Sequence, residues 1–165
     1  MTSFLQESNL FVNALNELRG KPVLVLGHRR PDGDCIGSQV GLTRILIELG
    51  IDARAVNQDP IPRTLKKFVG NTPFFSPEEI EGNDFTIVTV DCADKHRIGE
   101  ELSKRFPQVF LNIDHHVSNN NYATINFVLS DASATGEILA KFFLDCEMKI
   151  DSITADALYV GIATD

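Results

Sequence analysis

The stretch VLVLGHRRPDGDCIGS, residues 23–38, decides the fold of this chain. It opens with a purely apolar run and then places one histidine and two carboxylates, His28, Asp32 and Asp34, within seven positions. An apolar run bounded by proline and glycine (PVLVLG, 22–27) is typical of a strand that is buried on both faces. The ionisable residues therefore follow the carboxyl end of a buried strand, where α/β sheets bind their ligands.

Apolar runs alternate with helical patterns along the rest of the chain. We expect strands at 22–27, 52–57, 85–90, 109–113 and 125–129. We expect helices at 4–19, 37–50, 134–145 and 153–164, with a short one in 61–68. Ser3 and Gln6 have the spacing of a capping box for the first helix. This alternation predicts an α/β fold, a mainly parallel sheet with helices on both faces in a three-layer, Rossmann-like arrangement.

The loop after the first strand has its own expected geometry. Pro31 biases Arg30 toward an extended conformation. Gly33 gives the backbone freedom to turn the two flanking aspartates toward neighbouring positions. Gly37 and Ser38 then open a helix whose N-terminal amides favour an anion nearby.

Three of the expected strands are followed at once by acidic or imidazole side chains. His28, Asp32 and Asp34 follow the first of these strands, Asp91 follows 85–90, and Asp114, His115 and His116 follow 109–113. Parallel strands end at one edge of the sheet, so these groups should converge. Carboxylates gathered without Lys or Arg partners repel one another. A bound cation offsets this repulsion, and the number of candidate ligands is sufficient for two cations.

The mixture of ligand atoms narrows the choice of ion. Carboxylate oxygen and imidazole nitrogen without thiolate suit Mn²⁺, with Mg²⁺, Co²⁺ or Zn²⁺ as alternatives. The cysteines, Cys35, Cys92 and Cys146, form no C-x-x-C pair, which argues against a thiolate zinc site and a disulfide framework. We interpret Cys35 and Cys92 as small buried side chains.

The sequence does not match two other motifs that bind phosphate or cations. An EF-hand loop that starts at Asp32 needs an oxygen ligand at its fifth position and an acid at its twelfth, but Ile36 and Thr43 stand there. A P-loop needs Gly-Lys-Ser/Thr, a triplet that the sequence lacks.

Length, composition and charge restrict the class of protein. The 165 residues, 43% hydrophobic and 23% charged, suffice for one domain with a substantial core. No run approaches the roughly 18 apolar residues of a membrane span, and the first residues lack a signal-peptide pattern, so we expect a cytoplasmic protein without a membrane partner. A net charge of −8 disfavours long duplex nucleic acid as a partner. It still permits a small phosphorylated substrate, because bound metal ions reverse the local field.

These residues together resemble the DHH phosphoesterases. The resemblance rests on H-x-x-P-D-x-D-x-x-G-S at 28–38, the aspartate of VDCAD at 91, the Asp-His-His triplet of NIDHHVS at 114–116, and G-I-x-x-D at 161–165. The four motifs occur in order across essentially the whole chain and are highly specific together. The most similar subgroup contains nanoRNase-type oligoribonucleases and phosphoadenosine phosphate (pAp) phosphatases.

The resemblance assigns a role to each matching residue. It implies that one metal ion is held by His28, Asp32 and Asp91, and the other by Asp34, Asp91, His115 and Asp165, with Asp91 bridging. His116 is then a catalytic residue that contacts the substrate phosphate, and Asp114 orients a ligand histidine. Arg97 and Ser133 are further candidates for substrate contact.

The resemblance also implies an activity, a substrate class and a domain arrangement. We expect metal-activated water to hydrolyse phosphodiester or phosphomonoester bonds of small nucleotides: short single-stranded oligoribonucleotides, pAp, or both. A pyrophosphatase or exopolyphosphatase, a cyclic-dinucleotide phosphodiesterase and a noncatalytic nucleotide-binding module remain alternatives, and a homodimer stays open. Residues 1–165 correspond to the family's catalytic domain, and we expect a smaller substrate-binding domain after Asp165 in the native protein.

Several nearby residues have a plainer interpretation beside the functional one. Arg29 and Arg30 either steer an anionic substrate or form a solvated basic pair. His96 is expected at the surface. Tyr122 and Tyr159 carry no functional signal.

Overall fold

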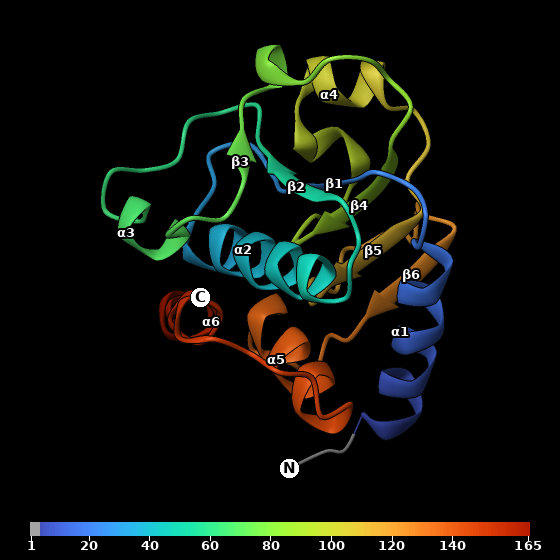
Figure 1. The fold of residues 1–165 in the computed structure, drawn as a ribbon, viewed down its shortest axis with the longest axis vertical. Coiled ribbons are helices and arrows are strands. Elements are labelled where there is room, and N and C mark those ends of the chain that lie inside the picture. The colour runs from blue at the N-terminus through green and yellow to red at the C-terminus, as the bar shows by residue number, and fades with distance from the viewer. Residues whose placement is uncertain (1–3) are drawn as a thin grey trace.

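The fold is built around one six-stranded parallel sheet, seen in a computed structural model that describes residues 4–165 (Figure 1). The strands are β1 (Val23–Leu26), β2 (Ala53–Val56), β3 (Phe74–Phe75), β4 (Thr86–Val90), β5 (Leu111–Asp114) and β6 (Ile125–Val128). They pair in the order β3-β2-β1-β4-β5-β6, and every pair is parallel. The apolar run that opened the sequence analysis is β1, which is buried along its whole length and pairs on both sides. The predicted parallel α/β fold is confirmed.

Helices cover both faces of the sheet, as expected. They are α1 (Leu5–Glu17), α2 (Gly33–Glu48), α3 (Lys66–Val69), α4 (Glu100–Arg105), α5 (Thr135–Asp145) and α6 (Ser152–Thr164), with 3-10 turns η1 (Pro77–Glu79) and η2 (Lys95–Ile98). One face packs against α1, α2 and α5, and the opposite face packs against η2 and α4. Helix α6 lies outside the sheet layer, against α2, α3 and α5.

Aromatic side chains fasten α1 and α5 to the edge of the sheet. The Phe11 ring stacks on Phe142 with centroids 4.7 Å apart, and Phe127 of β6 meets Phe142 edge-on at 5.4 Å. Burying one such side chain contributes roughly 1.5–3 kcal/mol to folding. Phe4 and Phe11 therefore both belong to the core.

Glycines at intervals of four residues let α2 and α6 approach closely. A Cβ added at Gly33 would lie 2.0 Å from Thr164 Oγ1, and one at Gly37 would lie 2.2 Å from the Ala157 carbonyl oxygen. A methyl group at Gly37 would overlap backbone and force the helices apart, whereas one at Gly33 would displace the Thr164 side chain. The contact brings the C-terminal end of α6 beside the N-terminal turn of α2.

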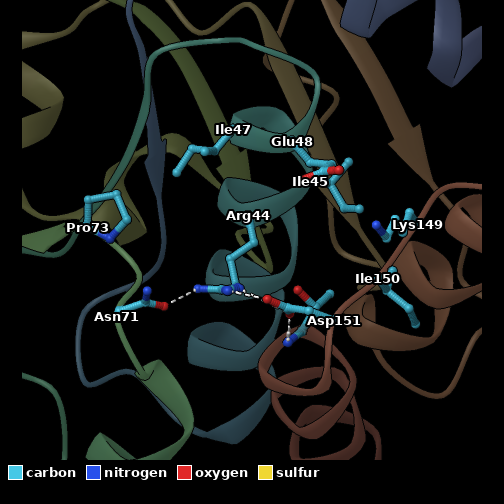
Figure 2. A pocket seen from close by; sticks show the side chains of 10 residues that line it. Arg44, Ile45, Ile47, Glu48, Asn71, Pro73, Lys149, Ile150 and Asp151 are labelled. Atoms are coloured by element: carbon cyan, nitrogen blue, oxygen red, sulfur yellow. Dashed lines mark hydrogen bonds and ion pairs between the residues drawn. The ribbon is translucent and has the colours of Figure 1, made fainter.

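An ion pair fastens the other ends of the same two helices (Figure 2). Arg44 of α2 reaches both oxygens of Asp151 and also donates to Asn71 Oδ1 at 2.8 Å. Asp151 is the N-cap of α6, where its Oδ1 accepts from the Thr154 N–H at 2.8 Å. The Arg44 charge holds the pKa of Asp151 well below its usual range. One carboxylate thus caps a helix and ties it to its neighbour.

Two predictions for the loop after β1 are wrong. The helix expected at 37–50 begins at Gly33, because Asp32 is its N-cap and accepts from the Cys35 N–H at 3.0 Å. Gly33 is therefore a helical contact residue and not a turn. Arg30 is not extended: its φ is +54°, in the left-handed region, and its N–H donates to Asp59 Oδ2 at 2.8 Å.

Other differences concern short elements. The elements β3, η1, η2 and α4 were not predicted, and β5 runs from Leu111 to Asp114 instead of the expected 109–113. Ser3, the expected capping residue of the first helix, lies outside the described residues. The cysteines are free thiols, and within residues 4–165 no helix has the length and hydropathy that crossing a membrane requires.

Candidate metal centre

The predicted metal-binding residues meet at the carboxyl edge of the sheet, although they come from distant parts of the sequence. His28, Asp91 and His115 follow strands β1, β4 and β5. Asp32 and Asp34 stand at the N-terminus of α2, and Asp165 follows the last residue of α6. Three overlapping groups, His28–Cys35–Asp91, Asp91–His115–His116 and Asp34–His115–Asp165, have ligand atoms within 4.8 Å of one another.

Asp91 stands at the centre of this cluster. Its Oδ2 lies 3.3 Å from His28 Nε2, and its Oδ1 lies 3.7 Å from His115 Nε2. The residue is buried and has a φ of +56°, a left-handed conformation that costs about 1–2 kcal/mol for most residues but that aspartate tolerates better. Its N–H still donates to the Ile113 carbonyl at 3.0 Å, so the strand pairing continues while the side chain turns to the cluster. The two oxygens of Asp91 thus face different imidazoles: Oδ2 faces His28, and Oδ1 faces His115 and also, at 3.6 Å, Nδ1 of His116.

The His28 ring is oriented by its own backbone. Its Nδ1 lies 2.7 Å from the Arg29 carbonyl oxygen, which can only accept, so Nδ1 carries the proton. Nε2 then faces two carboxylates, at 3.3 Å from Asp91 and 3.6 Å from Asp32. A lone pair aimed at two carboxylates requires a proton or a cation between them. Although burial lowers the pKa of His28, its contacts with Asp32 and Asp91 raise it above the ordinary value, and the pKa of Asp32 falls to about 2 beside His28.

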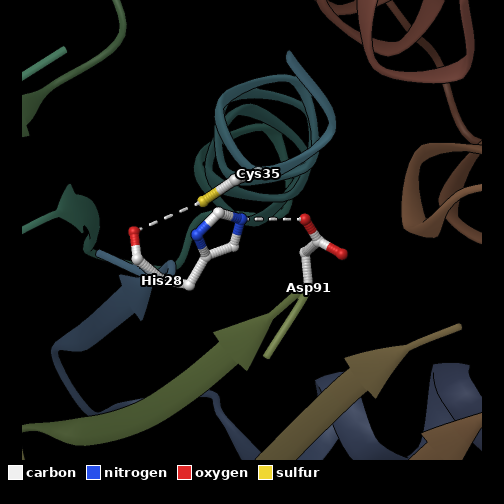
Figure 3. A group of neighbouring side chains, drawn as sticks. All are labelled: His28, Cys35 and Asp91. Carbon is white, nitrogen blue, oxygen red and sulfur yellow. Dashed lines mark hydrogen bonds and ion pairs between the residues drawn. The ribbon is translucent and has the colours of Figure 1, made fainter. Parts of the chain in front are cut away.

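Cys35 lies on the other side of the His28 ring (Figure 3). Its Sγ is 4.0 Å from the His28 carbonyl oxygen, and burial raises the pKa of the thiol to about 11. Without a metal ion the thiol is therefore protonated at neutral pH. This geometry agrees with a small buried side chain.

Asp34 is a fully buried carboxylate held by a helix N-terminus. Its two oxygens accept from the backbone N–H groups of Thr135 at 2.7 Å and Gly136 at 2.8 Å, in the first turn of α5. The Ser38 hydroxyl adds a third donor at 3.2 Å. Burial, and next the charge of Asp91, nevertheless raise the pKa of Asp34 to about 7. A neighbouring cation would stabilise its ionised form.

His115 supplies the clearest test of whether a metal fits. Among the described residues its Nε2 is buried and has no hydrogen-bond partner. The carboxylates around that nitrogen lie 3.5 Å (Asp165), 3.7 Å (Asp91) and 4.0 Å (Asp34) away, too far for good hydrogen bonds. A nitrogen left unpaired among three carboxylates fits a divalent cation with nitrogen and oxygen ligands.

Asp114 orients a histidine, but not the one that we expected to bind metal. Its Oδ1 lies 2.7 Å from Nδ1 of His116, and its Oδ2 accepts from the Asn119 amide at 2.6 Å. The contact with Asp114 raises the pKa of His116. Burial raises the pKa of Asp114, but the His116 and Asn119 hydrogen bonds outweigh it and keep that pKa below the ordinary value. The pair His116–Asp114 therefore lies at one side of the cluster, and each partner favours the charged form of the other.

The residues that support this pair do not stand out in the sequence. The Asn119 amide also donates to Asn112 Oδ1 at 2.8 Å, and the Asn112 amide reaches Thr89 Oγ1 and Tyr122 Oη, both at 3.0 Å. Tyr122, which carries no signal in the sequence, closes the network by donating to the Cys92 carbonyl at 3.0 Å. These partners are up to 33 residues apart, so only the assembled sheet brings them together.

Of the other residues considered near the site, some contact the metal-binding cluster and others lie away from it. Thr135 joins the cluster, since its hydroxyl donates to Asp91 Oδ1 at 3.2 Å. Ser133 is exposed, and its hydroxyl donates to Glu137 at 2.9 Å, within its own helix start. Arg97 lies with Arg29 in a separate pocket beside the cluster. His96 is exposed, as predicted.

The chain is similar to known proteins over most of its length. A family model described as DHH family, N-terminal domain, matches residues 22–162. A Streptococcus mutans protein named probable bifunctional oligoribonuclease and PAP phosphatase NrnA is 28% identical over 145 residues, covering 87% of this chain and 45% of that protein. The chain thus spans about half the length of such relatives.

Solved structures show the same fold. An exopolyphosphatase-related protein from Bacteroides fragilis superposes with a TM-score of 0.82 at 22% identity, covering 99% of this chain and 52% of that one. The exonuclease RecJ bound to manganese gives a TM-score of 0.51 at 20% identity, covering 100% of this chain and 43% of that one. A structural neighbour of this fold thus binds Mn²⁺, and this chain has residue groups that could hold metal.

Proposed function

Because the chain belongs to the DHH family and carries its N-terminal domain, we propose that it is the catalytic part of a metal-dependent phosphoesterase. Its substrates are small phosphorylated nucleotides: short single-stranded oligoribonucleotides, pAp, or both. The observation that carries this proposal is the placement of the two Asp91 oxygens against two different imidazoles, His28 and His115. A carboxylate in that position can bridge two cations.

Two divalent ions, most suitably Mn²⁺, would be held by this cluster. His28, Asp32 and Asp91 would hold one; Asp34, Asp91, His115 and Asp165 would hold the other. When bound, such ions acidify a water molecule and neutralise charge on a phosphate. The unpaired His115 Nε2 and the raised pKa of Asp34 support this assignment.

The protein's own groups orient the ligands and the substrate. The N–H groups of Thr135 and Gly136 fix both oxygens of Asp34, and the Thr135 hydroxyl fixes Asp91 Oδ1. Asp114 holds His116 by Nδ1 and favours the imidazolium form. His116 Nε2–H then donates a hydrogen bond to a phosphate oxygen of the substrate.

The experiment is a substrate panel with Mn²⁺ and with EDTA. The panel contains bis-p-nitrophenyl phosphate, a ribonucleotide trimer, pAp, pyrophosphate, polyphosphate and a cyclic dinucleotide. We expect Mn²⁺-dependent turnover of the generic diester and of the trimer or pAp. Preference for polyphosphate, pyrophosphate or the cyclic dinucleotide would replace the proposed substrate class. Tight nucleotide binding with no turnover of any substrate would identify a noncatalytic binding module instead.

A further inference from the structure

A basic pocket adjoins the metal-binding cluster along the same edge of the sheet. The cavity, of about 400 Å³, is lined by Arg29, Arg30, Gln58, Asp59 and Arg97. These residues come from the segments that follow strands β1, β2 and β4. Two of those strands, β1 and β4, also supply the cluster. Arg29 follows His28 directly, so their Cα atoms are about 3.8 Å apart.

The guanidinium groups in this pocket are unpaired. Within residues 4–165, the side chains of Arg29, Arg30 and Arg97 form no hydrogen bond and no ion pair. Other arginines of the chain have clear structural partners, such as Arg44 with Asp151 in Figure 2 and Arg105 with backbone carbonyls. The pocket therefore holds three arginine charges against one carboxylate, Asp59, in a chain with a net charge of −8.

The backbone holds these arginines in place at some cost. Arg30 adopts a left-handed φ of +54°, which is unfavourable for a long side chain before a proline. Two cross-links maintain it: the Arg30 N–H donates to Asp59 Oδ2 at 2.8 Å, and the Arg29 N–H donates to the Arg97 carbonyl at 2.7 Å. Gln58, the residue before Asp59, is itself held in place, because its side-chain Oε1 accepts from the Glu101 N–H at 3.1 Å. A strained backbone conformation that is maintained by hydrogen bonds from neighbouring segments is typical of a functional loop.

The pocket has the chemistry of a phosphate site. Arginine presents forked N–H donors that bind a phosphate through two parallel hydrogen bonds. The hydrolysed phosphate would sit at the metal-binding cluster, next to this pocket. A second phosphate on the same small substrate is the anion that can reach both.

We propose that the Arg29–Arg30–Arg97 pocket binds a second phosphate group of the substrate, beside the phosphate that is hydrolysed. This inference rests on the proposed function. It assigns the chain a preference for nucleotides that carry two phosphates over otherwise identical nucleotides that carry one. The second phosphate is either the terminal phosphate of a 5′-phosphorylated ribonucleotide dimer or the additional phosphate of a nucleoside bisphosphate.

The test compares matched substrates in matched variants. The substrates are pApA with ApA, and pAp with both adenosine 3′-monophosphate and adenosine 5′-monophosphate, so that the members of each pair differ by one phosphate and one monophosphate keeps the group that is hydrolysed. The variants are Arg29→Gln, Arg97→Gln and the control Arg63→Gln, which removes the same charge from an exposed arginine outside the pocket. We expect the ratio of kcat/KM within a pair to fall at least tenfold in Arg29→Gln or Arg97→Gln and to stay unchanged in Arg63→Gln. The pair that responds identifies which kind of second phosphate the pocket binds.

Binding without hydrolysis supplies an independent readout. In EDTA, calorimetry should show that the wild-type chain binds pAp at least tenfold more tightly than Arg97→Gln does, while Arg63→Gln matches the wild type. Ratios and affinities that are unchanged in both pocket variants would overturn the pocket proposal and leave the phosphoesterase proposal standing. Loss of pAp affinity in a chain that hydrolyses nothing would support the pocket and reject the phosphoesterase. Circular dichroism checks that the variants fold, as expected for side chains without hydrogen bonds.

Discussion

The backbone N–H of Gly136 donates a 2.8 Å hydrogen bond to Asp34 Oδ1 across 102 residues of sequence. The donor lies in the first turn of α5 and the acceptor in the first turn of α2, so the positive end of one helix stabilises a carboxylate of the other. A Cβ on Gly136 would lie 3.1 Å from that oxygen, a contact tighter than is usual. The geometry of the metal-binding cluster therefore depends on how α2, α5 and α6 pack.

The contact between α2 and α6 gives the first prediction. Gly37→Ala adds a methyl group 2.2 Å from the Ala157 carbonyl oxygen, so the helices must separate. We expect the free energy of unfolding to fall by about 1–3 kcal/mol. Calorimetric titration should also show weaker Mn²⁺ binding, because Asp34 and Asp165 move apart. Glu48→Ala, on an exposed part of the same helix, is the control, and a Gly37→Ala protein as stable as this control would contradict the packing argument.

The central position of Asp91 gives the second prediction. Asp91→Asn keeps the size of the side chain and tolerates the left-handed φ of +56°, but removes the charge that faces His28 and His115. We expect Mn²⁺-dependent hydrolysis of bis-p-nitrophenyl phosphate to fall by about a thousandfold, with the far-ultraviolet circular dichroism spectrum retained. Asp84→Asn, exposed just before the amino end of the same strand β4, should leave turnover intact. Substantial activity in Asp91→Asn would reject the bridging role.

The raised pKa of Asp34 gives a prediction about stability and pH in EDTA. Its pKa is about 7 in the folded chain against 3.8 for an unperturbed group, so between these values the folded state binds more protons than the unfolded state. Stability must therefore fall as pH rises, by at most about 1.4 kcal/mol per pH unit. Between pH 4.5 and 6 other groups contribute little, because the lowered pKa values of Asp32 and Asp114 act below that window and the raised pKa of His28 acts above it.

Urea unfolding at several pH values measures this slope. The wild type and Asp156→Asn, which alters an exposed carboxylate of α6, should show the decline, and Asp34→Asn should not. Excess Mn²⁺ should remove the decline in the wild type, since metal ligands bind in their deprotonated form. Parallel slopes for the wild type and Asp34→Asn would show that Asp34 is not the group responsible.

The contact between Asp114 and His116 gives the fourth prediction. Asp114→Asn removes the carboxylate that raises the pKa of His116, so that pKa should fall. Nuclear magnetic resonance of the ring protons in EDTA measures the change, with the exposed His96 ring as an internal reference. Asn119→Ala, which removes one donor to Asp114, should lower hydrolysis by about tenfold through a misplaced His116. A His116 titration that is identical in the wild type and Asp114→Asn would exclude this pairing.

Local patterns in the sequence were sufficient for the sheet and for most of the helices. The apolar runs at 22–27 and 85–90 became the central strands β1 and β4, because a strand covered on both faces must be apolar throughout. The same patterns gave no sign of the two-residue strand β3 or of the short helix α4, which are too short for a periodic signal. The start of α2 differs from the prediction because the Asp32 side chain accepts from the Cys35 N–H and so acts as the N-cap.

The sequence by itself determined which groups meet at the sheet edge, because parallel strands carry whatever follows them to the same end. Only the tertiary structure decided how those groups pair: that Asp114 holds His116, that Tyr122 and Asn119 support the pair, and that three arginines gather unpaired beside the cluster. The positions of the strands along the chain follow from short-range hydrophobic patterns, whereas their order in the sheet is a property of the tertiary structure. Hydrogen bonds and charges between segments tens of residues apart depend on distances that exist only after the helices have packed.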